Sequence, residues 1–149
     1  MQNLNFPNYH FKYKKVKDKS YIFDIVRKKF YLLTPEEWVR QHILHYLIFT
    51  KKYSKNLIAV EKKIEINQTF RRFDVVVFNH NMQAYILIEC KSPDVKISQS
   101  TFDQINQYNW LIKAPYLFLT NGMKHYICHV DFNKNNYQFI KELPENLYL

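Results

Sequence analysis

Glycine is almost absent from this sequence, because Gly122 is the only one in 149 residues. A phosphate-binding loop of the form G-x-x-x-x-G-K-[ST] needs two glycines, so the chain is not an ATP-driven motor of that kind. Cysteine is also scarce. Cys90 and Cys128 both lie in apolar, strand-like runs, which is typical of reduced thiols in a cytosolic protein rather than of a disulfide framework.

Long apolar runs are missing as well. No uninterrupted run approaches the ~20 residues that a membrane-spanning helix needs. No basic segment followed by an apolar one opens the sequence, so a secretory leader is not expected. We therefore expect a cytoplasmic protein. A chain of 149 residues fits a single domain, residues 1–149, with room for a hydrophobic core.

Acidic residues are outnumbered by basic ones. The chain has 22 Lys and Arg against 13 Asp and Glu, which gives a formal charge of +9 and a pI near 9.4. This balance favours a polyanionic partner, because neutralising phosphates releases their counterions. A basic surface can also serve solubility alone. Charge by itself therefore leaves nucleic-acid binding open.

The most informative stretch is RRFDVVVFNHNMQAYILIECKSP, residues 71–93. It predicts two strands, FDVVVF and AYILIECK, joined by a polar turn at residues 79–83. Asp74 stands at the entrance of the first strand, and Glu89 and Lys91 stand at the exit of the second. Unpaired buried charge is costly, so an apolar strand that ends in charges needs a reason for them. The pattern predicts that two carboxylates and an amine converge at one place.

Metal-assisted cleavage of a phosphodiester is the chemistry that uses such a trio. Mg²⁺ takes oxygen ligands, usually carboxylates together with water and a phosphate oxygen. Asp74 and Glu89 are the candidate ligands of Mg²⁺ or Mn²⁺, helped by the backbone carbonyl of Cys90, whose side chain is expected on the opposite face of the strand. Lys91 would orient the water and relieve it of a proton, or stabilise the charge of the transition state.

With these residues identified, the sequence resembles the PD-(D/E)XK nuclease superfamily. Asp74 is followed fifteen positions later by Glu-x-Lys, and Phe73 stands where many members carry proline. Most of the chain resembles the N-terminal nuclease domain of type I restriction enzyme R subunits and their short stand-alone relatives. The segments that carry the resemblance are FDIVRKKFYLLTPEEWVRQ, RRFDVVVFN, ILIECKSP, QINQY and APYLFLTNG. It implies a restriction-endonuclease-like fold, nuclease activity with magnesium, DNA as the partner and association with other restriction-modification subunits.

The first helix is predicted to begin at TPEE, residues 34–37, and to run to about Lys51. Thr34 can cap this helix, and Glu37 three residues later completes a capping box. The resemblance gives Glu37 a second role as a metal ligand, and the capping role is favoured. Arg40, expected outside the apolar stripe of the helix, is a candidate to contact substrate or brace the acids. The alternative is an ordinary surface pair between Arg40 and a neighbouring glutamate.

The second helix is predicted at residues 98–113 and places Gln104 and Tyr108, four residues apart, on the same side. The resemblance implies that Gln104 hydrogen-bonds a phosphate or a metal-bound water and that Tyr108 holds the DNA strand. Ordinary helix surface is the alternative for both. Arg71 and Arg72 are candidates to clamp phosphates, since guanidinium groups fit phosphate oxygens. One of the two arginines could instead pair with a nearby carboxylate.

The order of elements predicts an α/β/α sandwich around a mixed sheet of four or five strands. Its central hairpin carries the acids, and the helix at residues 98–113 crosses over to a strand at residues 116–120. Residues 1–19 contain the lysine-rich run FKYKKVKDK. We read them as a basic, mobile arm that lies along a phosphate backbone, or as a solvated tail.

The sequence therefore predicts a Mg²⁺-dependent DNA endonuclease. The resemblance implies that long relatives couple the domain to a helicase motor, and these 149 residues lack one. Cutting alone and cutting with a partner subunit both stay open. The rival from another class is a non-catalytic nucleic-acid-binding module of the same fold, and an RNA nuclease is a third alternative. The presence of all three catalytic-type residues favours the enzyme.

Overall fold

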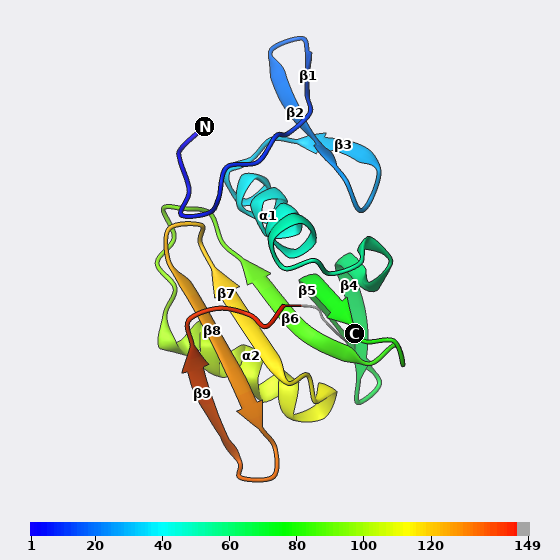
Figure 1. Cartoon of the computed structure of the whole chain (residues 1–149), viewed down its shortest axis with the longest axis vertical. Helices are drawn as coiled ribbons and strands as arrows, with labels where there is room; N and C mark the ends of the chain where they lie inside the picture. Colours follow the sequence, from blue (N-terminus) through cyan, green and yellow to red (C-terminus); the bar gives the residue numbers. More distant parts are fainter. Residues whose placement is uncertain (146–149) are drawn as a thin grey trace.

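A six-stranded mixed sheet is the central element of the computed structural model, which describes residues 1–145 (Figure 1). Neighbouring strands are antiparallel except β6 and β7, which are parallel. A parallel pair needs a crossover connection, and helix α2 (Gln99–Ile112) supplies it. In spatial order the strands are β4 (Ile58–Ile66), β5 (Thr69–Phe78), β6 (Ala84–Cys90), β7 (Tyr116–Thr120), β8 (His125–Asp131) and β9 (Asn136–Ile140).

The two helices pack against opposite faces of this sheet. On one face, α1 (Pro35–His45) contributes Val39 and Ile43 to a core that also contains Ile86 and Ile88 of β6. On the other, α2 packs against a second core that contains the next side chain of β6, Leu87. Side chains that alternate along one strand thus enter different cores. The predicted α/β arrangement is confirmed.

The predicted count of four or five strands is wrong, because the sheet has six. The additional edge strand is β9, which pairs with β8 across a turn. Four of its five residues are exposed, including Tyr137 and Phe139. An exposed edge strand lacks the alternation of buried and exposed residues that marks a half-buried strand. Its membership of the sheet was therefore hard to infer from sequence.

A separate antiparallel sheet of three strands lies on the far side of α1 (Figure 1). It consists of β1 (Tyr13–Val16), β2 (Lys19–Asp24) and β3 (Lys29–Leu32). Part of the segment expected to be an arm therefore forms a strand. Upstream of β1, Leu4 and Phe6 pack against the α1-side core, and the backbone N–H of Asn5 donates to the carbonyl of Gly122 over 2.8 Å. The mobility of this segment stays a prediction.

Helix α1 begins as predicted but is shorter. The hydroxyl of Thr34 accepts from the backbone N–H of Glu37 over 3.0 Å, which satisfies one of the free donors of the first turn. After His45 the chain continues as a π-helical turn, η1 (Tyr46–Thr50), and then a short 3₁₀ helix, η2 (Lys55–Leu57). Arg40, expected outside the apolar stripe of the helix, is buried, because α1 is covered on one side by the large sheet and on the other by the N-terminal segment and small sheet.

Helix α2 agrees with the prediction within one residue at each end. Ser98 caps its start, and Lys113, in a left-handed conformation with a φ of 67°, ends it. Phe102, Ile105 and Asn109 are its buried residues. No helix within residues 1–145 is long and apolar enough to span a membrane.

Candidate active site

Asp74 and Glu89 lie side by side on neighbouring strands. Val75 of β5 pairs with Ile88 of β6 in an antiparallel ladder. Asp74, which precedes Val75, therefore lies beside Glu89, which follows Ile88. The backbone N–H of Cys90 donates to Asp74 Oδ2 over 2.8 Å. This hydrogen bond fixes the Asp74 carboxylate against the end of β6. The structure therefore brings together the two acids that the sequence predicted to meet.

Glu89 is a buried carboxyl with an unfavourable environment for its charge. Glu89 is only 8% exposed to solvent. Burial, followed by the charge of Asp74 and a hydrogen bond to it, raises the pKa of Glu89 to about 8, and the charges of Arg71 and Lys91 oppose this rise. Glu89 Oε1 has no hydrogen-bond partner within residues 1–145. Binding of a proton by Glu89, or of a cation beside it, would reduce the cost of this buried negative charge.

Asp74 is also held by Arg40 of α1. Arg40 Nη2 lies 3.2 Å from Asp74 Oδ1, and Arg40 Nη1 pairs with Glu37. Burial lowers the pKa of Arg40, but the charges of Glu37 and Asp74 outweigh it and raise that pKa above its usual value. Arg40 also lies 3.4 Å from Glu36. The two roles weighed for Arg40, bracing an acid and pairing with a helix glutamate, therefore occur together.

Glu37 does not complete the predicted capping box. The backbone N–H of Thr34, which a capping-box glutamate would accept from, donates to the carbonyl of Leu32 instead. The Glu37 carboxylate accepts from Arg27 over 2.6 Å, from Gln41 over 3.0 Å and from Arg40. Its role as a metal ligand stays a prediction, and both of its oxygens already have donors.

Asp24 and Arg27 belong to the same network and were missed by sequence reasoning. Asp24 is fully buried at the end of β2, and its carboxylate accepts from the Nε of Arg27 over 2.7 Å and from Gln41 over 2.9 Å. Arg27 then reaches Glu37. The local signal was an acid at the end of a strand followed three residues later by an arginine in a turn, DIVR. Its partners on α1 were not visible in that pattern.

Lys91 follows β6 directly, and its backbone N–H donates to the carbonyl of Thr120 on β7 over 2.8 Å. The charge of Lys91 acts on Glu89 and also on Glu36 of α1. Burial, followed by the charge of Asp74, raises the pKa of Glu36, while Arg40 and Lys91 oppose that rise. Glu36 is therefore a further carboxyl near the Asp74–Glu89 pair. The sequence had given Glu36 no role in the site.

The candidate substrate-binding residues separate into two groups. The Arg71 guanidinium lies 5.0 Å from the centre of the Tyr108 ring, and its charge acts on Glu89. Arg71 and Tyr108 are therefore close to the acids. Arg72 is exposed and lies 3.9 Å from Glu61, which matches the alternative of a carboxylate partner. Gln104 is exposed on α2, and its side chain makes no hydrogen bond within residues 1–145.

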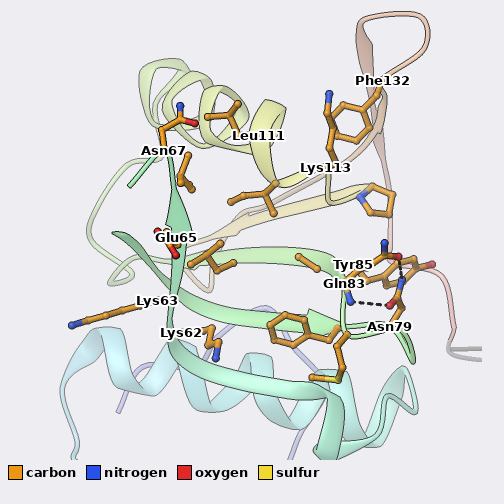
Figure 2. Close-up of a pocket in the computed structure, with 17 residues that line it drawn as sticks. Lys62, Lys63, Glu65, Asn67, Asn79, Gln83, Tyr85, Leu111, Lys113 and Phe132 are labelled. Atoms are coloured by element: carbon orange, nitrogen blue, oxygen red, sulfur yellow. Dashed lines mark hydrogen bonds between the residues drawn. The ribbon is translucent and has the colours of Figure 1, made fainter. Parts of the chain in front are cut away.

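A large groove lies elsewhere on the described part of the chain. It encloses about 930 Å³ between β4, the β5–β6 turn and the end of α2 (Figure 2). Lys62, Lys63 and Lys113 are among its lining residues, and Asp74, Glu89 and Lys91 are not. The acids therefore lie outside this groove. We assign the candidate site by its paired carboxylates rather than by cavity size.

The paired acids fit a hard divalent cation. Within residues 1–145, no three His, Cys, Asp or Glu side chains are placed to hold one ion together. Mg²⁺ does not need such a cage, since one or two carboxylates with waters and substrate oxygens are its usual ligands. The partnerless Oε1 of Glu89 beside Asp74 provides a free oxygen donor of the right kind.

A comparison with protein-family models identifies the relatives of this chain. The model of the type I restriction enzyme R protein N terminus matches residues 35–144. The chain belongs to this family. Membership in the type I restriction enzyme R protein N-terminal family confirms the resemblance found in the motifs, and it indicates a nuclease-related function in DNA restriction. The match extends from α1 to beyond β9, and the small sheet of β1, β2 and β3 lies outside it. A comparison with curated proteins found no match.

Proposed function

We propose that this chain is a metal-dependent DNA endonuclease with a PD-(D/E)XK-type site on a restriction-endonuclease-like fold. The observation that carries the proposal is the Asp74–Glu89 pair, in which a buried carboxyl with a raised pKa lies beside a second carboxylate. Perturbed carboxyls of this kind are concentrated at functional sites. Hydrolysis would add water across one phosphodiester bond and leave a phosphate monoester and a hydroxyl.

Asp74, Glu89 and the backbone carbonyl of Cys90 would hold Mg²⁺ or Mn²⁺. The ion, when bound, supplies a water of lowered pKa and neutralises charge on the phosphate. Arg40 and the Cys90 N–H restrain the Asp74 carboxylate, so little reorganisation of that ligand is needed. Lys91 is proposed to position the attacking water and take up its proton, or to stabilise the charge that develops on the phosphate.

The remaining candidate residues would bind substrate. Arg71, whose guanidinium lies 5.0 Å from the centre of the Tyr108 ring and whose charge acts on Glu89, is proposed to contact a phosphate oxygen. Arg72 and Gln104 are exposed, and we propose that they contact DNA farther from the cleaved bond. The formal charge of +9 favours such a partner. Other restriction-modification subunits are further proposed partners.

A non-catalytic nucleic-acid-binding module is the second candidate function. The Asp74 carboxylate already has a buried cationic partner in Arg40 at 3.2 Å, so the site has a charge balance that does not depend on a metal. In this alternative, Asp74 and Glu89 would be structural, and DNA would bind without being cut.

Nicking of supercoiled plasmid with Mg²⁺ or Mn²⁺ distinguishes the two functions. We expect the wild type to nick DNA, and Asp74→Asn and Glu89→Gln to lose nicking while remaining folded. Glu65→Gln, which makes the same chemical change at an exposed position of β4, should nick normally. Calorimetric titration with the same ions should show binding by the wild type and by Glu65→Gln only. Absence of nicking and of metal binding in the wild type would favour the binding module.

A further inference from the structure

The outer face of the small sheet combines lysines with aromatic rings. Ile22 and Asp24 of β2 are buried toward α1, so the alternate residues Tyr21 and Phe23 face outward. The antiparallel register places Lys14 opposite Tyr21 and Phe30 opposite Phe23. Residues paired across an antiparallel ladder share a face. One surface therefore carries lysines of β1 above rings of β2 and β3.

The lysine side chains lie over these rings. Lys14 Nζ is 4.6 Å from the centre of the Phe30 ring and 5.7 Å from that of Tyr21, and Lys12 Nζ is 5.7 Å from that of Phe23. Such contacts hold a cation without neutralising its charge. Within residues 1–145, no carboxylate forms an ion pair with Lys12 or Lys14. Their charge is therefore available to an external anion.

Most of the net charge of the chain comes from this region. Residues 12–29 contain seven lysines and one arginine against two aspartates, a formal charge of +6 out of +9 for the whole chain. One of the two aspartates, Asp24, is buried and paired with Arg27. The seven lysines are all exposed. They do not support the core, so folding alone does not explain their accumulation on one small sheet.

The small sheet is fixed relative to the acids of the candidate site. Arg27, in the turn between β2 and β3, pairs with Asp24 and with Glu37 of α1. Arg40 then joins Glu37 to Asp74. Because these side chains are buried or nearly so, the network is a rigid connection rather than a surface contact. A ligand held by the small sheet would be held at a defined position with respect to Asp74.

We propose that the outer face of β1, β2 and β3 binds the phosphate backbone of duplex DNA beside the cleaved bond. The inference rests on the proposed function for its choice of DNA as the polyanion. Lys12 and Lys14, with Lys19 at the start of β2, are the residues that contact phosphates. Because the cation–π contacts restrict these lysines before binding, less side-chain entropy is lost on forming the complex.

The test is the salt dependence of duplex binding, measured by fluorescence anisotropy of a short labelled duplex in the presence of a chelator. A phosphate contact contributes roughly 0.9 to the slope of log K against log salt concentration. The triple variant Lys12→Gln, Lys14→Gln, Lys19→Gln should therefore lower this slope by roughly 2 to 3 and weaken binding about tenfold or more. The triple arginine variant at the same three positions should keep the wild-type slope.

A matched control carries three glutamines elsewhere. Lys55, Lys134 and Lys141 are exposed and lie outside the small sheet, so their replacement by glutamine changes the net charge by the same amount. This control variant should lower the slope of log K against log salt concentration by less than the small-sheet variant does. Circular dichroism establishes that each variant is folded. Equal slopes for the two glutamine variants would overturn the inference, and so would a wild type that does not bind duplex DNA.

The outcome is separable from that of the nuclease assay. A wild type that binds DNA through the small sheet but does not nick plasmid would uphold this surface and contradict the endonuclease. A wild type that nicks plasmid while the small-sheet variant binds like its control would uphold the endonuclease and contradict this surface.

Discussion

Arg40 and Asp74, 34 residues apart in sequence, form a largely buried ion pair over 3.2 Å. Arg40 pairs with Glu37 through its other terminal nitrogen. Arg40 of α1 thus fixes the position of the Asp74 carboxylate, and the same guanidinium balances the charge of Glu37.

Replacement of Arg40 should destabilise the fold strongly. Arg40→Ala leaves Glu37 and Asp74 as buried carboxylates without this cation, and breaking a buried pair in this way costs about 3–5 kcal/mol. Arg40→Lys should cost less but still be destabilising, because an ammonium cannot replace a guanidinium that donates to two carboxylates. Urea denaturation measures both. Arg72→Ala, at an exposed pair 3.9 Å from Glu61, should change stability by less than about 0.5 kcal/mol. Comparable losses at the two arginines would contradict the buried network.

The stability of the metal-free protein should fall as pH rises through the range in which Glu89 ionises. The folded state raises the pKa of Glu89 to about 8, so the folded state binds this proton more tightly than the unfolded state does. The resulting stabilisation is present below the ordinary pKa of glutamate and is lost as pH rises toward 8. Urea denaturation at a series of pH values, with chelator present, measures the slope.

Glu89→Gln isolates this contribution. The amide cannot ionise, so the variant should lose less stability than the wild type between pH 5 and about 8.5, where each unit of pKa difference is worth about 1.4 kcal/mol. Added Mg²⁺ should stabilise the wild type at the upper end of the range and leave the variant unchanged. Parallel stability curves for the two proteins would show that Glu89 does not titrate as proposed.

Lys91→Ala should separate cutting from binding. If Lys91 acts on the water or the developing charge, its loss should slow single-turnover nicking by roughly 100-fold or more. Affinity for Mg²⁺ and for DNA should stay near the wild-type value. Lys96→Ala, at an exposed position in the loop after β6, is the matched control. Unchanged nicking by Lys91→Ala would remove this amine from the reaction.

Gly122→Ala should destabilise the attachment of the N-terminal segment. Gly122 has a φ of +85°, and a Cβ built there would lie 2.9 Å from Leu4 Cδ2 and 3.0 Å from Val39 Cγ2. Both the left-handed backbone and the close contacts disfavour a side chain, so we expect a loss of about 1 kcal/mol or more. Leu4→Ala should lose less additional stability in the Gly122→Ala background than alone, because it relieves one clash. Thermal unfolding of the four proteins measures this coupling, and strict additivity would contradict it.

The sequence predicted the part of the fold that is built from local patterns. The β5–β6 hairpin was visible as two β-branched runs around a polar turn, and its register follows from alternation. The bounds of α2 were also predicted, within one residue at each end. Because the acids lie at the ends of these well-marked strands, their meeting could also be predicted.

The rest depends on contacts between distant segments. Asp24 and Gln41 are 17 residues apart, and Arg40 and Asp74 are 34 apart, and no periodicity links such pairs. Strand β1 of the small sheet was missed because all of its residues are exposed. A lysine-rich strand with so little apolar pattern reads as a tail.

The position of Arg27 has a consequence for where this domain begins. The family match starts at residue 35, yet Arg27 supplies one of the guanidinium groups that neutralise Glu37, and Phe11 covers His42 with ring centres 4.8 Å apart. A fragment cut at residue 35 would leave Glu37 with only one of its two guanidinium partners, Arg40, and would expose the aromatic residues of α1 that the N-terminal segment covers. The cooperative folding unit therefore extends upstream of the segment that matches the family. A truncation at the family boundary would remove residues that pack against α1.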